Sequence, residues 1–440
     1  MLSKGSETIG TLVPFADPLW MTTLDSPYFN DSHRRLSKYL RRYVDEELSP
    51  YCSDWEEASA VPDAVQKRFA EVGCTAACVY PLAKGYMDGI TLPAGIPANE
   101  WDAFHDFVLI DELMRCGYLG VCWALATGNI IGCPPLVNFG SEALKRELLP
   151  KILKGDKRIC LGVTEPGAGS DVANIATTAR REGDFFIVNG SKKWITNAVY
   201  SDYVTAAVRT GGPGAGGISC LIIPLDLPGV ERRKLQNSGV ASSGSTLIDF
   251  EDVKVPVKYL VGKENQGFKI FLSNFNHERL WLSIQALRMS RICIEDAYGH
   301  ANKRKTFGKH LIEQPIIRDK FTHMGRLVEA LQAQLESLYY HLNRNYSDAD
   351  LAGMTALCKV NASVCLEYVN RECQQVFGGL GYQRGTLAGG RVEQISRDLR
   401  VIVIGGGSYE IMSDLAMKQQ IKIMDGRQPR DVKDAIPAKL

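Results

Sequence analysis

The chain has 440 residues, and 51 basic against 50 acidic side chains give it a formal net charge of +1. This balance argues against broad electrostatic binding to nucleic acid. A chain of this length can bury a large core in two or three domains, and it has no run of about 18 uncharged apolar residues that would predict a membrane span. The twelve cysteines are scattered, which predicts buried, reduced thiols and no metal site.

Residues 1–30 lack a periodic pattern and are expected to form an N-terminal arm. Residues 31–157 carry helical patterns and predict an N-terminal helical domain. Its first helix is expected to start at an N-cap formed by Asp31-Ser32, and a later helix is expected over residues 107–116.

Residues 158–270 change character and predict a middle β-domain. Short apolar runs bounded by turn residues predict strands at 159–163, 203–208 and 218–223. Residues 185–196 are expected to form a hairpin with Asn189-Gly190 as its two-residue turn.

Residues 271–424 return to a helical pattern with an apolar seam, which needs partner helices and predicts a C-terminal antiparallel bundle. The seam consists of Phe321, Met324, Val328, Leu331, Leu335, Leu338 and Leu342. Residues 425–440 form a polar tail that ends in Ala438-Lys439-Leu440, which is similar to a peroxisomal C-terminal address. We therefore expect a peroxisomal location, and otherwise a cytoplasmic one.

The most informative motif is the loop TEPGAGSD at 164–171, with Trp194-Ile195-Thr196-Asn197 about two dozen residues later. A proline and two glycines prevent regular structure in the loop, which therefore exposes N–H groups and hydroxyls at the end of a strand. Trp194 adds a flat apolar face and Thr196 a hydroxyl, so the two segments can hold a planar, hydrogen-bonding heterocycle. The pair resembles the flavin-binding signature of the acyl-CoA dehydrogenase family.

The resemblance covers nearly the whole chain beyond residue 30. It implies an α+β fold, the acyl-CoA dehydrogenase fold, with an N-terminal helical domain, a middle β-barrel-like domain and a C-terminal four-helix bundle. It also implies FAD as cofactor and a homotetramer or homodimer, because Arg304 and the glycine loop at 375–382 match segments that reach the dinucleotide of a neighbouring subunit. The cofactor-binding residues it implies are Leu161, Val163, Thr164, Gly169, Ser170, Trp194, Thr196, Arg304, Phe307, Gln375, Gly378, Gly379, Ser408 and Glu410.

Dehydrogenation of a thioester requires a carboxylate close to the α-carbon. Many family members keep this glutamate near the C-terminus, at the position that Gly406 occupies here. A second subgroup, resembling isovaleryl-CoA and long-chain acyl-CoA dehydrogenases, carries it on the first bundle helix directly before an arginine, and Glu278-Arg279 matches that pattern. We predict that Glu278 is the base, near the start of its helix and off the apolar stripe, with Glu410 as the competing candidate.

The resemblance also implies substrate contacts from Ser170, Arg279 and Gly407. The backbone N–H of Gly406 is expected to donate to the thioester oxygen, where negative charge develops in the enolate. Trp123 either shortens the acyl pocket or packs between helices, and both readings stay open at this point.

The predicted function is FAD-dependent α,β-dehydrogenation of an acyl-CoA, with the α-proton passing to Glu278 and the β-hydride to flavin N5. The electron acceptor is a flavoprotein partner or oxygen, and oxygen would make the protein an acyl-CoA oxidase. A further alternative keeps the fold with another substrate, such as a nitroalkane. A binding or DNA-associated protein without dehydrogenation is the last alternative, against which Glu278 and the near-neutral charge argue.

Overall fold

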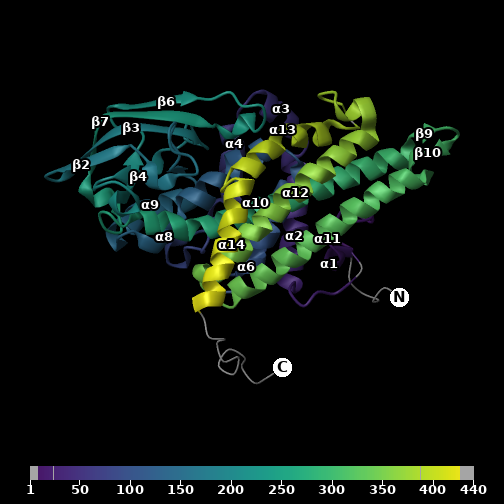
Figure 1. Ribbon diagram of the computed structural model, residues 1–440, viewed down its shortest axis with the longest axis horizontal. Helices are drawn as coiled ribbons and strands as arrows, with labels where there is room; N and C mark the ends of the chain where they lie inside the picture. The colour runs from purple at the N-terminus through teal and green to yellow at the C-terminus, as the bar shows by residue number, and fades with distance from the viewer. Residues whose placement is uncertain (1–7, 23, 387, 427–440) are drawn as a thin grey trace, which may run out of the picture.

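Three blocks of structure follow one another along the chain: helices, then a β-sheet, then longer helices (Figure 1). The computed structural model describes residues 8–22, 24–386 and 388–426. The predicted targeting sequence Ala438-Lys439-Leu440 lies outside these described residues. The order of the blocks confirms the predicted fold class, with an N-terminal helical domain, a middle β-domain and a C-terminal helical domain.

Mostly short helices form the N-terminal block. They are α1 Leu19–Thr22, α2 Asp31–Tyr43, η1 Val44–Leu48, α3 Cys52–Glu57, α4 Asp63–Glu71, α5 Cys74–Ala77, α6 Ala103–Leu113, η4 Met114–Cys116, α7 Leu119–Cys122, η5 Trp123–Gly132, α8 Pro134–Phe139 and α9 Glu142–Leu153. The predicted N-cap of α2 is wrong by one residue: the side chain of Asn30 accepts from the N–H groups of Ser32 and His33. Asn30 has the extended backbone of a capping residue, whereas Asp31 is already helical.

One helical stretch, Leu119–Phe139, is long and apolar enough to cross a membrane by length and composition, with a mean hydropathy of 1.3. However, 83% of the window concerned is buried inside the protein. Asn274 of α10 donates to the Ile131 carbonyl (2.8 Å), and Thr205 of the sheet donates to the Gly132 carbonyl (2.7 Å). The stretch is therefore a core helix that joins the sheet to the C-terminal bundle.

Residue types that can bind metals serve other roles in the described chain. All twelve cysteines are free and buried, as predicted. Ligand atoms of His33, Asp102 and His105 lie within 4.8 Å of one another. The N–H of Asn30 donates to His33 Nδ1 (2.9 Å) and the N–H of Asp102 to His105 Nδ1 (3.1 Å), so both rings take part in capping α2 and α6. This cluster is explained by its helix caps.

The middle block is one eight-stranded sheet. Its strands are β1 Ile159–Gly162, β2 Thr178–Glu182, β3 Phe185–Ile195, β4 Tyr203–Arg209, β5 Ile218–Pro224, β6 Val230–Lys234, β7 Thr246–Pro256 and β8 Leu260–Val261. The order is β6-β7-β3-β2-β4-β5-β8, and β1 pairs in parallel with β4. The strands predicted at 159–163, 203–208 and 218–223 are thus confirmed as β1, β4 and β5.

The predicted hairpin turn at Asn189-Gly190 is wrong. β3 continues through this pair and remains paired with β7, although the register shifts there. The turn lies earlier, at Gly183-Asp184 between β2 and β3. Gly190 has φ +138°, and a Cβ there would lie 2.7 Å from the Cα of Thr177. Glycine is needed here because the strand bulges and the backbone of Thr177 passes close to it. An Asn-Gly pair can therefore mark a bulge within a strand as well as a hairpin turn.

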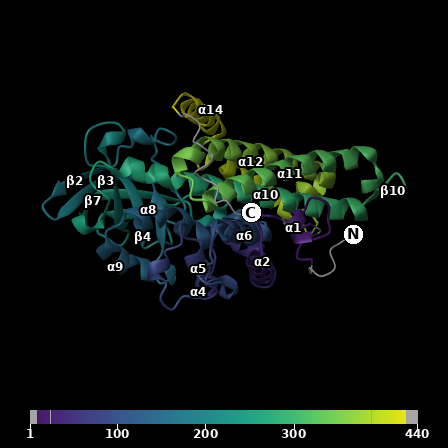
Figure 2. The same cartoon turned by 90° about the horizontal axis from the view of Figure 1, so that it is seen from below.

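The C-terminal block consists mainly of long helices. They are α10 Gly267–Lys303, α11 Pro315–Asn343, α12 Asp348–Phe377, α13 Gly390–Ile404 and α14 Tyr409–Gly426, with a hairpin of β9 Lys305–Thr306 and β10 Lys309–His310 between α10 and α11. The predicted apolar seam lies on α11, and its members from Phe321 to Leu338 are buried. Seen from below, α10 runs between the N-terminal helices and α12, and α14 lies at the outer face (Figure 2).

Buried charges tie the N-terminal arm to α10. The fully buried guanidinium of Arg288 donates to Asp17 Oδ1 (2.6 Å) and to both carboxylate oxygens of Asp111. Asp17 also accepts from Arg41 (3.1 Å), which in turn donates to Glu112 (3.1 Å). Loss of one member leaves an uncompensated charge in the interior, which is far more destabilising than loss of a surface pair.

We predict that Arg288→Ala lowers the free energy of unfolding by about 3–5 kcal/mol, because Asp111 and Asp17 remain buried with fewer partners. Arg233→Ala is the matched control, since Arg233 pairs with Asp249 at the surface, and its change should stay within about 1 kcal/mol. Urea unfolding followed by circular dichroism measures both. Equal, small losses in the two variants would contradict the anchoring role.

Candidate active site

The two segments predicted to hold a flat heterocycle lie side by side in the structure. The N–H of Lys193, near the end of β3, donates to the carbonyl of Thr164 in the loop after β1 (2.9 Å). Trp194 follows the bonded lysine, and Thr196 lies in the turn just after β3. Sequence reasoning therefore paired two segments that the fold brings into contact.

The free edge of β1 offers backbone donors to such a ring. The N–H of Tyr203 donates to the Arg158 carbonyl (3.1 Å). This bond shows that the backbone groups of residues 158, 160 and 162 point toward β4. Alternate residues make the bonds in a parallel ladder, so the N–H groups of Leu161 and Val163 point away from β4. Neither N–H donates to an acceptor in the described part of the chain. These donors fit a heterocycle with oxygen and nitrogen acceptors along one edge, as in flavin.

An exposed aromatic face lies on the neighbouring segment. Trp194 is 51% exposed and has a left-handed backbone, with φ +60°. A bulky residue rarely adopts this conformation, so the surrounding structure must maintain it. A Cβ built on Gly167 or Gly169 would have no atom within 4 Å, and Ser170 beside them is exposed. The residues present thus leave an open, partly apolar surface that suits a flavin ring.

A buried ion pair supports the loop from inside. Glu165 Oε1 accepts from Lys192 Nζ (2.7 Å) and from the N–H of Thr177 (3.0 Å), so its carboxylate stabilises the loop. Lys192 Nζ also donates to the carbonyl of Val163 (3.1 Å). Burial lowers the pKa of Lys192 to about 8 against the opposing effect of Glu165. Lys192 therefore fixes the backbone at one of the two residues with a free donor.

Five of the other predicted cofactor residues lie at the far end of the bundle, whereas Ser408 and Glu410 lie at the start of α14. Arg304 directly follows α10, and Phe307 on the β9–β10 hairpin is 99% exposed. The last residue of α12, Phe377, lies against His300 of α10 (ring centroids 4.7 Å). This exposed end carries Arg304, Phe307, Gln375, Gly378 and Gly379. Figure 1 places it opposite the β-domain, so a single chain does not bring the two predicted halves of the cofactor site together.

Glu278 lies about three turns into α10, not near the helix start as predicted, because α10 begins at Gly267. Its Oε2 is buried and has no hydrogen-bond partner. A Cβ on Gly406 would lie 3.8 Å from Glu278 Oε1. The two sequence positions at which the resemblance allows a catalytic glutamate therefore meet at one place in the fold.

Opposing electrostatic effects act on Glu278. Burial raises the pKa of its carboxyl, and the charges of Arg279, Lys359 and His277 oppose that rise by favouring the ionised form. His277 is held in turn by Asp106, whose Oδ2 lies 2.9 Å from His277 Nε2. A buried carboxylate with a raised pKa and a free oxygen can accept a proton from a bound molecule, as a general base must.

A glycine loop, 405–407, approaches this carboxylate from the end of α13. Its last two residues have φ +66° and +99°, and a Cβ on Gly406 would lie 2.5 Å from Leu282 Cδ1. Only glycine combines these angles with so close an approach. Arg279 Nε donates to the Gly406 carbonyl (3.4 Å), and the N–H of Gly406 donates to no acceptor in the described residues. That N–H is available to a bound oxygen.

The competing base candidate has a different environment. Glu410 is exposed on the first turn of α14, next to Ser408. Its pKa is lowered, with its own backbone N–H and then Ser408 as the main causes. Glu410 therefore lacks the burial that distinguishes Glu278.

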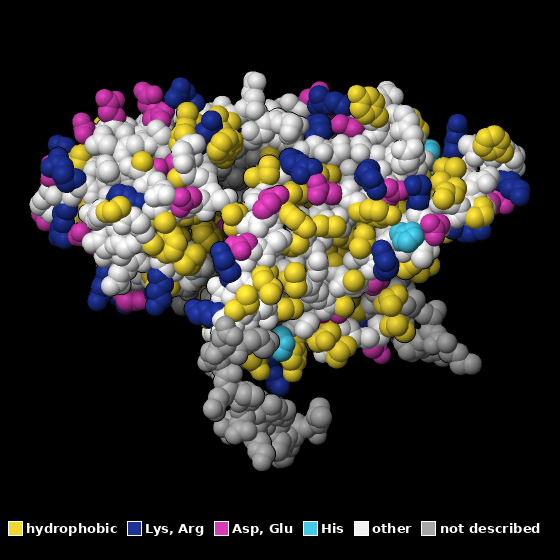
Figure 3. All heavy atoms as spheres, viewed as in Figure 1, with side chains coloured by type: hydrophobic (Ala, Val, Ile, Leu, Met, Phe, Trp, Pro, Cys, Tyr) yellow, Lys and Arg dark blue, Asp and Glu magenta, His cyan; other side chains and the backbone are white. Residues whose placement is uncertain are grey.

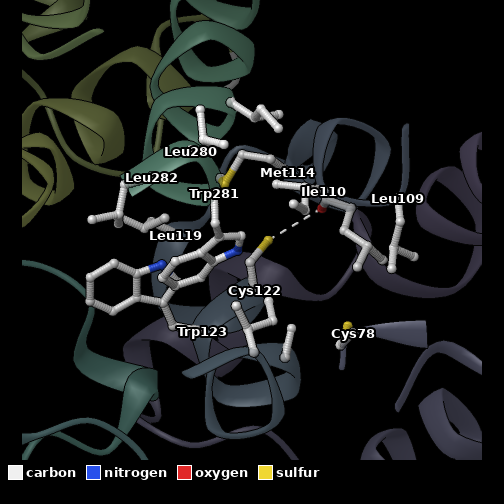
Figure 4. Packing of buried hydrophobic residues seen from close by; sticks show 14 of the residues in the cluster. Cys78, Leu109, Ile110, Met114, Leu119, Cys122, Trp123, Leu280, Trp281 and Leu282 are labelled. Atoms are coloured by element: carbon white, nitrogen blue, oxygen red, sulfur yellow. Dashed lines mark hydrogen bonds between the residues drawn. The ribbon is translucent and has the colours of Figure 1, made fainter. Parts of the chain in front are cut away.

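Two indoles, those of Trp123 on η5 and Trp281 on α10, lie together in the core (Figure 4). Trp123 and Trp281 stack with ring centroids 5.6 Å apart, and Trp123 Nε1 donates to Gln285 Oε1 (3.0 Å). Trp123 thus packs between helices, one of the two roles considered for it. Its effect on acyl length stays a prediction.

Sequence reasoning missed residues that join these parts. Asn197 Nδ2 donates to the Trp123 carbonyl (3.0 Å), and its Oδ1 accepts from the N–H of Gly128 (2.9 Å), which ties the end of β3 to η5. Lys192 looks like half of an exposed lysine pair in the sequence, so no signal marks it. For Lys359 the sequence does contain a signal. It lies four residues from both Thr355 and Ser363, which are buried, so all three residues lie on one core-facing stripe of the helix.

Comparisons with known proteins agree with this architecture. The N-terminal, middle and C-terminal domain models of acyl-CoA dehydrogenase match residues 30–156, 160–253 and 265–421. The chain is 47% identical to acyl-CoA dehydrogenase AFT10-1 of Alternaria alternata over 94% of this chain and 97% of that protein. It is 39% identical to acyl-CoA dehydrogenase apdG of Emericella nidulans over 95% of this chain and 97% of that protein.

A solved structure gives the same result. The crystal structure of a probable acyl-CoA dehydrogenase from Mycobacterium abscessus matches with a TM-score of 0.80 and 35% identity, covering 89% of this chain and 100% of that one. The chain therefore belongs to the acyl-CoA dehydrogenase family and is an oxidoreductase. Family membership implies a flavin cofactor and an acyl-CoA substrate.

We predict that Lys192→Met weakens flavin binding about tenfold, because the Val163 carbonyl loses a charged donor worth about 1.5–3 kcal/mol and Glu165 loses its counter-ion. Titration of the apoprotein with FAD, followed by flavin fluorescence, measures the affinity. The double variant Lys192→Met with Glu165→Gln should recover part of the loss, since no unpaired charge remains. Unchanged affinity in Lys192→Met would contradict the supporting role.

Proposed function

We propose that the protein uses FAD to desaturate an acyl-CoA at the α,β bond, with Glu278 as the base. The observation that carries this proposal is half-buried Glu278, whose Oε2 is buried without a hydrogen-bond partner and whose Oε1 lies 3.8 Å from where a Cβ of Gly406 would lie. A base at this place fulfils the role of the glutamate that other members keep at the Gly406 position. We therefore propose that the chain is a member of the subgroup with its glutamate on the first bundle helix.

Bound FAD would supply the hydride acceptor. The chain's own residues then divide the remaining work. Glu278 takes the α-proton, and the N–H of Gly406 donates to the thioester oxygen as charge develops there. Arg279 holds the Gly406 carbonyl and thereby orients the glycine loop. Leu161, Val163, Thr164 and Thr196 supply donors for the ring, and Trp194 covers it.

We further propose that the active protein is a homodimer or homotetramer. The two predicted halves of the cofactor site lie at opposite ends of one chain, so a second copy is needed to complete a site with Arg304 and the 378–379 glycines. Figure 3 shows hydrophobic side chains gathered over the bundle face formed by α12 and α14. Exposed members of this face include Met354, Leu357, Val364, Ile411, Met417 and Ile421. A second copy would cover such a face.

Acyl-CoA oxidase is the second candidate function. The C-terminal Ala438-Lys439-Leu440 favours it, because a peroxisomal location would separate the protein from the usual mitochondrial flavoprotein acceptor. Both candidates share the first half-reaction and differ in what reoxidises the flavin. Admission of air to the reduced protein separates them: fast recolouring with peroxide supports an oxidase, and slow recolouring supports a dehydrogenase that needs a partner.

We predict that anaerobic addition of an acyl-CoA bleaches the flavin of the wild-type protein and that Glu278→Gln slows bleaching at least about 10³-fold, because the amide cannot accept the α-proton. Stopped-flow absorbance with acyl-CoAs of graded length measures the rate and the length preference. Glu410→Gln tests the competing base candidate and should bleach far faster than Glu278→Gln. Glu147→Gln, at a surface ion pair, is the control and should bleach like wild type.

Full turnover by Glu278→Gln with slow turnover by Glu410→Gln would overturn the assignment of the base. No bleaching of the flavin-loaded wild type by any acyl-CoA would overturn the proposed substrate class.

A further inference from the structure

A fully buried lysine on α12 binds the segment that carries the glycine loop. Lys359 Nζ donates to the carbonyls of Ile402 (2.6 Å), Val403 (3.1 Å) and Gly407 (3.1 Å), which uses all three of its donors. The first two carbonyls belong to the last turn of α13, where helix carbonyls lack intrahelical partners. Lys359 thus joins the end of α13 to the far side of the loop.

The loop is therefore held at two consecutive peptide groups. Arg279 binds the Gly406 carbonyl (3.4 Å), and Lys359 binds the Gly407 carbonyl (3.1 Å). Each peptide group is planar, so the two held carbonyls also fix the N–H groups of Gly407 and Ser408. The Gly406 N–H belongs to the preceding peptide group, which lies between the held end of α13 and the held Gly406 carbonyl. Glycines with φ +66° and +99° have no side chain to restrict them, and these two cations supply the restriction.

Lys359 also acts on Glu278 through its charge. No hydrogen bond joins the two, yet each influences the ionisation of the other. Burial lowers the pKa of Lys359 to about 8, and Glu278 opposes this shift. Around Glu278, α10 itself contributes Arg279 and His277, α12 contributes Lys359, and α6 contributes Asp106, which His277 binds. The glycine loop contributes no titratable side chain.

We propose that Lys359 is a positioning residue for the acyl site, which fixes the glycine loop beside Glu278 and supplies positive charge to that carboxylate from a neighbouring helix. This inference rests on the proposed function, since it concerns the same base. It adds a residue more than 80 positions from Glu278 in sequence, contributed by a different helix. Its role differs from that of a buried cap alone, because a cap without charge would leave the ionisation of Glu278 unchanged.

The test compares Lys359→Gln, which keeps amide donors but loses the charge, with Lys359→Met, which loses both. We expect the acidic limb of the bleaching rate against pH to move upward by about one unit in both variants, because Glu278 loses a nearby positive charge. The rate at the pH optimum should fall about 10²-fold in Lys359→Met, where the loop is released, and less in Lys359→Gln. Lys258→Met is the control, because Lys258 pairs with Glu147 at the surface and should change neither.

If the acidic limb of the bleaching rate against pH does not move in a folded Lys359→Gln protein, the inference is wrong. The proposed function would remain intact in that case, provided that the wild-type flavin bleaches. Absence of wild-type bleaching would overturn the proposed function instead. In that case the infrared carboxyl band of Glu278, identified by its loss in Glu278→Gln, gives the same titration without turnover. Lys359→Gln also covers a failure of Lys359→Met to fold, since it retains donors for the three carbonyls.

Discussion

A carboxylate oxygen buried without a hydrogen-bond partner, Oε2 of Glu278, is the constraint on which the rest of the site depends. An unpaired interior charge is strongly unfavourable, so such a group persists only where the surroundings compensate it or the chemistry requires it. Around Glu278 the compensation comes from Arg279, His277 and Lys359, none of which binds the free Oε2. The carboxylate therefore stays ionisable while one oxygen is left for a ligand.

The sheet and the helical bundle contribute different groups to the site. The sheet edge at β1 and the end of β3 present donors and an indole, and α10 presents Glu278, the proposed base. The core helix through η5 connects them, since Asn197 binds it from the sheet side and Asn274 from α10. Sites built on regular elements keep their geometry better than sites on free loops. The one loop at the base, 405–407, is accordingly held by two cations.

Much of this architecture was predictable, and the errors have physical reasons. Periodicity revealed the three blocks and the seam of α11, and the TEPGAGSD and WITN segments revealed the pair joined by Lys193 and Thr164. Local rules failed where tertiary contacts decide: Asn189-Gly190 forms a bulge because β7 continues alongside it. Gly406, which approaches Glu278, is 128 residues away in sequence, and Lys192 and Lys359 bind backbone carbonyls that the sequence does not identify.

We propose that Glu278 exchanges a proton with the α-carbon of a bound acyl thioester. The most direct measurement is exchange of the α-protons in deuterium oxide, followed by nuclear magnetic resonance. The probe is an acyl-CoA with sulfur at the β-position, which can be deprotonated at the α-carbon but not desaturated. The account predicts rapid exchange with the flavin-loaded wild-type protein and almost none with Glu278→Gln. Equal exchange by both proteins would contradict it.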